Sequence, residues 1–145
     1  MAKTSSTSST HKRQISKQLV KTVKKAAAAS HAPYSHINVG AVLYSAAGTM
    51  HAGTNIESCS YSLTMCAERV ALFTALSAGV RDFQLLLVFS PQIAFIVPCG
   101  DCLQVLSEFA PELLIVTMNE RDEFKFLPIK TLLTKPFVLT QPFKG

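Results

Sequence analysis

Two short stretches of the sequence decide how the chain folds: Met65-Cys66-Ala67-Glu68-Arg69 and Pro98-Cys99-Gly100-Asp101-Cys102. Together they supply three thiols and one carboxylate, and each opens a segment whose apolar periodicity predicts a helix. Cys99 and Cys102 are spaced i, i+3, so both thiols point to one face of one helical turn. Three thiolate ligands leave the fourth position of a tetrahedral zinc ion open, which is typical of catalytic zinc sites. The sequence therefore predicts a catalytic zinc centre where two helix N-termini meet.

A carboxylate and a guanidinium follow the first cysteine and suggest how the centre works. Glu68 lies two residues after Cys66, near the open side of the metal, where it could accept a proton from water. Burial at that position should raise the pKa of Glu68. Zinc with three thiolates carries a net negative charge, and we expect the neighbouring Arg69 to offset it from behind the ligands.

The predicted positions of the thiols favour ionisation. Cys66 and Cys99 each fall in the first turn of a predicted helix, where exposed N–H groups and the positive dipole end lower the pKa of a thiol. Cys59 precedes Cys66 by seven residues, on a predicted loop. The sequence therefore also allows Cys59 to be a fourth thiol ligand, which would make the zinc site a closed structural one.

The totals are those of an ordinary globular domain. The chain has 145 residues, of which 48% are hydrophobic and 16% charged, enough for one domain with a sizeable core. It contains no apolar run long enough to span a bilayer and no apolar secretory segment at its N-terminus, so we expect a cytoplasmic protein. In that compartment the four cysteines indicate metal or redox use rather than disulfides.

The net charge of +5 is concentrated near the N-terminus. Seven of the fourteen Lys and Arg residues fall within the first 25 positions, and residues 1–10 are rich in Ser and Thr. We therefore predict a disordered basic tail over residues 1–13 and a single domain over residues 14–145. The tail could contact nucleic acid or acidic lipid, although a solvated tail is the simpler interpretation.

Apolar periodicity predicts the order of the elements along the domain. It favours helices at 14–30, 65–78 and 99–109, and strands at 39–43, 49–54, 83–89 and 113–118. Thr64 is expected to cap the second helix and Gly79 to end it. The buried part of that helix should hold Val70, Leu72, Phe73, Ala75 and Leu76. The nearly unbroken apolar strand at 83–89 should be buried on both faces beside parallel neighbours, which predicts a three-layer α/β fold.

At these residues the chain resembles the small homotetrameric, zinc-dependent cytidine deaminases, over about residues 15 to 137. The matching runs are Pro33-Tyr34-Ser35-His36, Val39-Gly40-Ala41, Asn55-Ile56-Glu57 with Tyr61, Cys66-Ala67-Glu68-Arg69, Pro98-Cys99-Gly100-Asp101-Cys102 with Gln104, and Leu132-Leu133 with Phe137. The resemblance implies a three-layer α/β/α fold with a mixed sheet of about five strands. It also implies a homotetramer with shared active sites.

The resemblance assigns the metal and the chemistry residue by residue. Cys66, Cys99 and Cys102 would hold Zn²⁺, and Glu68 would carry protons from water to N3 of the base and then to departing ammonia. The reaction would be hydrolytic deamination of cytidine and deoxycytidine to uridine and deoxyuridine, in pyrimidine nucleoside salvage.

The resemblance also implies substrate contacts. Asn55 and Glu57 would bind ribose hydroxyls, and the Ala67 backbone would contact the base. Three aromatic residues would reach into or pack around the site of a neighbouring subunit: Tyr34, Tyr61 and Phe137.

Three positions depart from the usual pattern of this family. Ile37 stands where an aromatic residue normally packs on the nucleoside, and Ser58 stands where Asn is common. Leu103 replaces an Arg that usually follows the last zinc cysteine, which leaves Arg69 to offset the thiolate charge.

These departures keep two alternatives open. Ile37 is compatible with a deaminase of a modified cytosine nucleoside, as in the blasticidin-S deaminases. A zinc-stabilised nucleic-acid-binding module that uses the basic tail is the second alternative. It is disfavoured because the core lacks a basic patch interleaved with aromatic residues.

Overall fold

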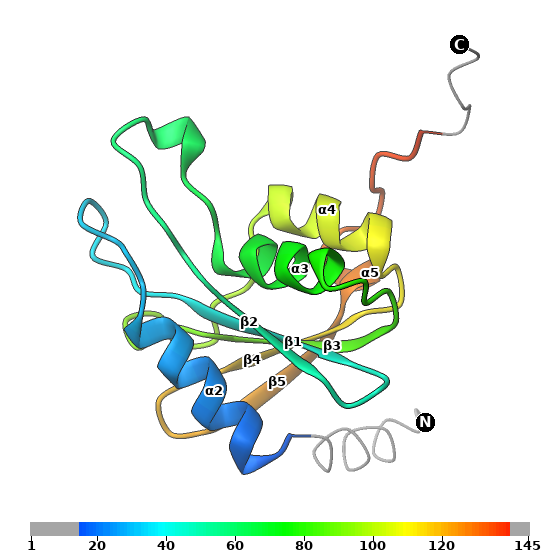
Figure 1. Cartoon of the computed structure of the whole chain (residues 1–145), viewed down its shortest axis with the longest axis horizontal. Coiled ribbons are helices and arrows are strands. Elements are labelled where there is room, and N and C mark those ends of the chain that lie inside the picture. Colours follow the sequence, from blue (N-terminus) through cyan, green and yellow to red (C-terminus); the bar gives the residue numbers. More distant parts are fainter. Residues whose placement is uncertain (1–14, 140–145) are drawn as a thin grey trace, which may run out of the picture.

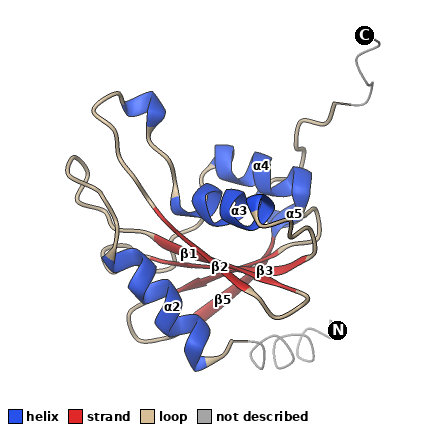
Figure 2. Ribbon diagram, in the orientation of Figure 1, coloured by secondary structure: helices blue, strands red, loops and turns tan. Residues whose placement is uncertain are grey.

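A five-stranded mixed sheet forms the middle layer of the computed structural model, which describes residues 15–139 (Figures 1 and 2). Its order is β2-β1-β3-β4-β5. The strands are β1 (Gly40–Ser45), β2 (Met50–Thr54), β3 (Phe83–Phe89), β4 (Leu114–Met118) and β5 (Phe124–Pro128). β1 is antiparallel to both β2 and β3, β3 is parallel to β4, and β4 is antiparallel to β5. The predicted tail at 1–13 lies outside the described residues.

Helices cover both faces of this sheet and confirm the predicted three-layer α/β/α architecture. Helix α2 (Lys17–Ala28) lies on one face, and α3 (Ala67–Ser77), α4 (Gly100–Phe109) and the short α5 (Ile129–Leu132) lie on the other (Figure 2). A 3₁₀ helix, η1 (Tyr61–Leu63), lies in the connection between β2 and α3 (residues 55–66), an arm that projects away from the sheet (Figure 1). Within residues 15–139, no helix combines the length and the apolar character that crossing a membrane requires.

The central strand β3 divides two hydrophobic cores. Leu85 and Leu87 pack toward α2, whereas Leu86 and Val88 pack toward α3 and α4. Because consecutive side chains of a strand point to opposite faces, a strand buried on both faces must be apolar throughout. The burial prediction for 83–89 is therefore right over Leu85–Phe89, but only β4 is a parallel neighbour, since β1 is antiparallel.

Two glycines allow the helices to approach the sheet closely, one on each face. A Cβ atom on Gly53 in β2 would overlap the backbone of Ala67 and Ala71 in α3. A Cβ atom on Gly40 in β1 would overlap the backbone of α2 in the same way. The first contact sets the distance between β2, which leads into the predicted substrate residues, and the first turn of α3, which carries Glu68.

Several predicted boundaries were wrong, and each has a local reason. Helix α2 begins at Lys17 because Ser16 is its N-cap, whose Oγ accepts a hydrogen bond from the Leu19 N–H at 3.1 Å. Thr64 does not cap α3: the N-cap is Cys66, and the Thr64 hydroxyl accepts the Ser58 N–H at 3.1 Å instead.

Two further expectations along the chain also need correction. Phe73 is 40% exposed rather than buried, because it lies on the outer side of α3. No strand was predicted after residue 118, but Phe124–Pro128 forms strand β5, where Phe124 and Phe126 pack toward the α2 side of the sheet. Pro128 ends this edge strand, where a missing N–H is tolerated.

Candidate metal and active site

The three predicted cysteine ligands meet where α3 and α4 begin. Cys66 is the N-cap of α3, Cys99 is the N-cap of α4, and Cys102 lies in the first turn of α4 with no exposed surface. Their sulfur atoms all lie within 4.8 Å of one another, and the Cys66 and Cys99 sulfurs are 3.9 Å apart. Of the four free cysteines, Cys59 is exposed and does not belong to this cluster.

Two thiols of the cluster have pKa values shifted in opposite directions. Hydrogen bonding from Cys102, and then from Arg69, lowers the pKa of Cys66 to about 5. The same interaction with the Cys66 thiolate raises the pKa of Cys102 well above its usual range. The Arg69 Nη2 lies 3.6 Å from the Cys66 sulfur, so a cation lies next to one of the predicted ligands. The low pKa of Cys66 comes from hydrogen bonds of neighbouring side chains and from the charge of Arg69, rather than from the helix N-terminus as the sequence predicted.

Glu68 is buried next to the thiols. It occupies the first turn of α3, is 4% exposed, and has its Oε2 at 3.9 Å from the Cys102 sulfur. Burial raises its pKa to about 7, in the expected direction. A carboxylate with this pKa can both take up and release a proton near neutrality.

The donor set fits a zinc ion. Three thiols that can converge on one ion are soft ligands of the kind that Zn²⁺ prefers, and they leave a position open. The buried Nε of Arg69 has no hydrogen-bond partner among residues 15–139, and its Nη2 is directed at a ligand. This arrangement suits a centre with excess negative charge.

A pocket of about 260 Å³ opens onto this cluster. It is lined by the predicted residues Ile37, Asn55, Glu57, Cys66, Ala67, Glu68 and Cys99, together with Ser35, Val39, Thr64, Ile96 and Val97. The structure thus brings two of the predicted metal ligands, the predicted catalytic carboxylate and the predicted ribose-binding residues to one cavity, with Cys102 buried behind its wall next to Glu68. Sequence reasoning missed the wall formed by Ile96 and Val97, because the loop between β3 and α4 carries no motif signal.

The two predicted ribose-binding residues are held by segment 30–39. The Asn55 Oδ1 accepts the Val39 N–H at 2.8 Å, and its Nδ2 donates to the Ile37 carbonyl at 2.8 Å. The Glu57 Oε2 accepts the backbone N–H groups of Tyr34 at 2.9 Å and Ser35 at 3.2 Å. Both side chains are therefore fixed before any ligand binds.

The predicted aromatic residues lie outside this cavity. Tyr34 and Tyr61 pack edge to face with ring centroids 5.5 Å apart, and both line a shallow neighbouring pocket that shares Glu57. Phe137 is 74% exposed and is tied to α4, because its backbone N–H and carbonyl both bond to the Gln104 side chain at 2.8 Å. The structure brings none of the three rings to the zinc cluster of the same chain.

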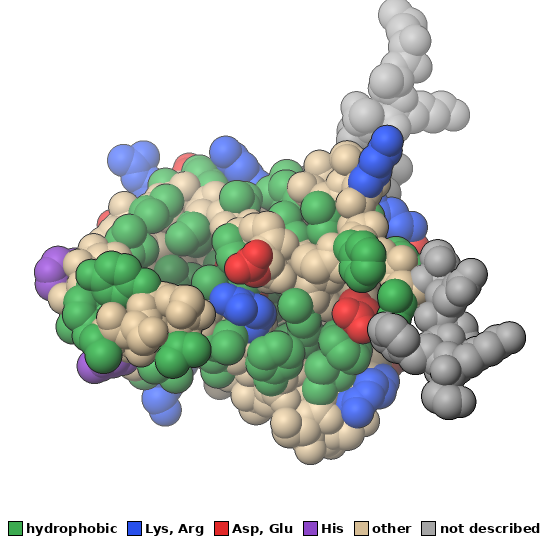
Figure 3. All heavy atoms as spheres, turned by 90° about the horizontal axis from the view of Figure 1, so that it is seen from above, with side chains coloured by type: hydrophobic (Ala, Val, Ile, Leu, Met, Phe, Trp, Pro, Cys, Tyr) green, Lys and Arg blue, Asp and Glu red, His purple; other side chains and the backbone are tan. Residues whose placement is uncertain are grey.

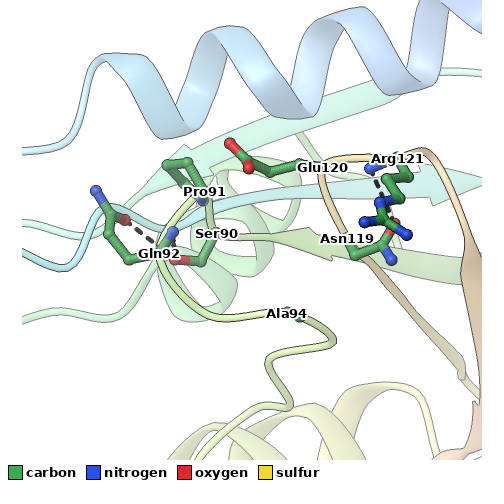
Figure 4. Close-up of a pocket in the computed structure, with 7 residues that line it drawn as sticks. All are labelled: Ser90, Pro91, Gln92, Ala94, Asn119, Glu120 and Arg121. Atoms are coloured by element: carbon green, nitrogen blue, oxygen red, sulfur yellow. Dashed lines mark hydrogen bonds between the residues drawn. The ribbon is translucent and has the colours of Figure 1, made fainter.

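A second depression of about 330 Å³ lies beyond the carboxyl ends of β3 and β4 (Figure 4). Its lining residues are Ser90, Pro91, Gln92, Ala94, Asn119, Glu120 and Arg121. The polar groups here bond to one another: Ser90 Oγ donates to Gln92 Oε1 at 3.2 Å, and Asn119 Oδ1 accepts the Arg121 N–H at 3.0 Å. None of the predicted metal-ligating or catalytic residues lines this depression, whereas Cys66, Cys99 and Glu68 line the other pocket.

Three thiols and a buried carboxylate at two helix N-termini of a three-layer α/β fold are the features of a zinc-dependent hydrolase. The family model described as the cytidine and deoxycytidylate deaminase zinc-binding region matches residues 13–118, and the chain belongs to this family.

Similar proteins agree with this family. The chain is 46% identical over 92 residues to a cytidine deaminase of Sporosarcina psychrophila, covering 63% of this chain and 68% of the relative. The crystal structure of a cytidine deaminase from Burkholderia pseudomallei superposes with a TM-score of 0.79 at 37% identity, covering 85% of this chain and 100% of the other. A blasticidin-S deaminase of Bacillus cereus is more distant, at 30% identity over 57% of this chain and 65% of the relative.

Proposed function

We propose that the protein catalyses the hydrolytic deamination of cytidine and deoxycytidine, giving uridine or deoxyuridine and ammonia. The observation that carries this proposal is the single pocket in which a three-thiol cluster, a buried carboxylate and a fixed amide–carboxylate pair meet. The cluster and Glu68 suit attack of water on an amino-substituted ring carbon, and Asn55 with Glu57 suits a sugar. Similarity to named cytidine deaminases supports the same reaction.

Cys66, Cys99 and Cys102 would hold the metal as thiolates. When bound there, zinc would supply Lewis acidity, which polarises the attacking water. Arg69 offsets the excess negative charge of three thiolates from 3.6 Å behind Cys66. Leu103 cannot share this task, because it is an apolar residue buried in the core.

Glu68 would move the protons. In the first half of the reaction the oxygen of water forms a bond to C4 of the base, and Glu68 carries a proton from that water to N3. In the second half Glu68 takes the remaining proton from the new C4 hydroxyl and delivers it to the amino group; the C4–N4 bond breaks, C4 keeps the oxygen as a carbonyl, and ammonia leaves. Its burial beside Cys102 keeps this carboxylate away from bulk water.

The remaining contacts would position the nucleoside. Asn55 and Glu57 would bind the sugar, the Ala67 backbone would contact the base, and Ile37 would form an apolar wall with Ile96 and Val97. A branched aliphatic wall can pack against a pyrimidine ring without stacking on it.

We also propose that the enzyme is a homotetramer whose subunits complete one another's sites. Tyr61, Leu63 and Phe137 are each at least 70% exposed, and hydrophobic side chains are spread over the face that carries α3 and α4 (Figure 3). Large exposed apolar side chains of this kind mark interaction surfaces. Tyr34, Tyr61 and Phe137 would then lie at the pocket of a neighbouring subunit.

Nucleoside salvage in the cytoplasm is the setting that we propose for this activity. All four cysteines are free thiols, and two of them lie 3.9 Å apart in the metal cluster. Such thiols persist in a reducing compartment, where disulfides are rare.

The direct test is to incubate the zinc-loaded protein with cytidine and to measure uridine and ammonia. Stoichiometric release of both products is the expected result. If cytidine and deoxycytidine are both inert while blasticidin S is deaminated, the modified-nucleoside alternative is correct. If all three are inert and the protein binds RNA with strong salt dependence, the nucleic-acid-binding alternative is correct.

A further inference from the structure

Asn55 presents one free donor to the pocket. Its Oδ1 accepts two hydrogen bonds, from the Val39 N–H at 2.8 Å and from the Ser30 hydroxyl at 2.5 Å. Its Nδ2 donates one hydrogen to the Ile37 carbonyl at 2.8 Å. A backbone donor and a backbone acceptor therefore fix which way the amide faces. The second N–H of this amide has no acceptor among residues 15–139.

Glu57 is the complementary acceptor. Its Oε2 accepts the N–H groups of Tyr34 and Ser35, and its Oε1 accepts the Ser35 hydroxyl. The Ser35 Oγ itself accepts the Ile37 N–H at 3.1 Å, so the hydroxyl hydrogen of Ser35 is directed to Glu57. A carboxylate has about four acceptor positions, so about one is left for a ligand. The bond from Ser35 is also the main reason that the pKa of Glu57 is lowered, which keeps it an acceptor at neutral pH.

We propose that Ser35 is a positioning residue for Glu57: its hydroxyl and its N–H hold the carboxylate in the orientation in which Glu57, together with Asn55, can bind a ring hydroxyl of the sugar. This ring hydroxyl would accept the free N–H of Asn55 and donate to the remaining acceptor of Glu57. A hydroxyl is a group that donates and accepts through one atom, whereas a hydrogen in its place leaves both protein groups unpaired. Since it names what selects the sugar, this inference rests on the proposed function.

The test compares two substrates in four proteins. We would measure kcat and KM for the wild type, Ser35→Ala, Ser35→Thr and Ser77→Ala, with cytidine and with 2′,3′-dideoxycytidine, which lacks both ring hydroxyls. Ser77 is an exposed serine at the C-terminal end of α3 and serves as the matched control. If the dideoxynucleoside turns over too slowly, its inhibition constant against cytidine replaces kcat/KM.

Ser35→Ala should lower kcat/KM for cytidine about tenfold, mainly through KM, because a hydrogen bond to a charged group is lost. It should leave the constants for 2′,3′-dideoxycytidine unchanged, since this substrate has no ring hydroxyl that could donate to Glu57. Ser35→Thr, which keeps the hydroxyl, should behave like the wild type, and so should Ser77→Ala.

An equal loss on both substrates would mean that Ser35 only supports the fold, and no loss on cytidine would mean that Glu57 does not need it. Either result overturns the inference while leaving cytidine deamination intact. A wild type that deaminates no cytosine nucleoside would instead refute the proposed function itself, and the inference with it.

Discussion

Cys99 and Cys59 are both exposed free thiols, but only Cys99 belongs to the three-sulfur cluster. Cys99→Ala should therefore release zinc, because two thiols bind the ion more weakly than three. We expect near-complete loss of bound zinc after dialysis against a chelator that leaves the wild type loaded. The measurement is zinc content by atomic emission.

Cys59→Ala is the matched control and should keep its zinc and its activity. If Cys59→Ala loses zinc to the same chelator, a rearranged loop supplies a fourth ligand and the site is closed. That outcome would contradict the open, catalytic coordination inferred here.

A substitution at Arg69 tests whether this cation offsets the negative charge of the three thiolates. Replacing it with Gln removes the cation 3.6 Å from the Cys66 sulfur, and kcat should fall about 10- to 100-fold, as for other partners that lie behind metal ligands. Steady-state kinetics with a zinc assay would separate lost chemistry from lost metal. Arg81→Gln, which removes an exposed guanidinium that bonds to the backbone carbonyls of Leu76 and Val80, should change neither. Unchanged kcat in Arg69→Gln would remove Arg69 from the charge balance.

For individual residues, the sequence predicted which side chains lie together but not the hydrogen-bond partners that hold them in place. The spacing of Cys99 and Cys102 and the nearness of Glu68 to Cys66 are local, so helix geometry alone brings them together. The bonds that fix Asn55 come from residues 16 to 25 positions earlier in the chain. Such partners depend on tertiary structure and carry no periodic signal.

The close contact between Gly53 in β2 and the backbone of α3 positions the first turn of α3 in the site. Gly53→Ala should push α3 away from β2, because its Cβ would overlap the backbone of Ala67 and Ala71. We expect a stability loss of roughly 1–3 kcal/mol, typical of overpacking. Because the displaced turn carries Cys66 and Glu68, kcat/KM and zinc retention should fall as well. Thermal unfolding, zinc content and kinetics measure the three effects.

Gly40→Ala makes the matched comparison on the opposite face of the sheet. Its Cβ would overlap the backbone of α2, so a similar stability loss is expected. Zinc retention at a temperature where both variants are folded should stay at the wild-type level. If the two variants lose zinc equally, the Gly53 contact has no particular role in placing α3.

Long, strongly periodic elements were predictable, whereas short ones were not. Strand β3 and helices α3 and α4 were predicted within about two residues, because their apolar patterns are long. Strand β5 was missed because Phe124–Pro128 is a short edge strand with one lysine and one proline. The N-cap of α3 is Cys66 rather than Thr64, since the Thr64 hydroxyl accepts the N–H of Ser58 in the arm instead.

The whole molecule should be a tetramer if exposed aromatic residues complete neighbouring sites. Leu63 is 70% exposed on the projecting arm, and Leu63→Glu should dissociate the assembly because a buried unpaired charge is costly. Analytical ultracentrifugation should give the mass of four chains for the wild type and a smaller mass for the variant, with activity lost in parallel. Lys21→Glu, on the exposed side of α2, should remain assembled. A fully active wild-type monomer would contradict shared sites.

In the proposed reaction a zinc-loaded centre and the Glu68 carboxylate together deaminate cytidine. We would add cytidine to the wild type and to Glu68→Gln, each containing one zinc per chain, and follow the ultraviolet absorbance as cytidine becomes uridine. We expect conversion by the wild type and a rate about 10²- to 10⁴-fold lower in the variant, the usual contribution of a proton-transferring side chain. Equal rates in the two proteins, or no conversion by the zinc-loaded wild type, would contradict the proposed reaction.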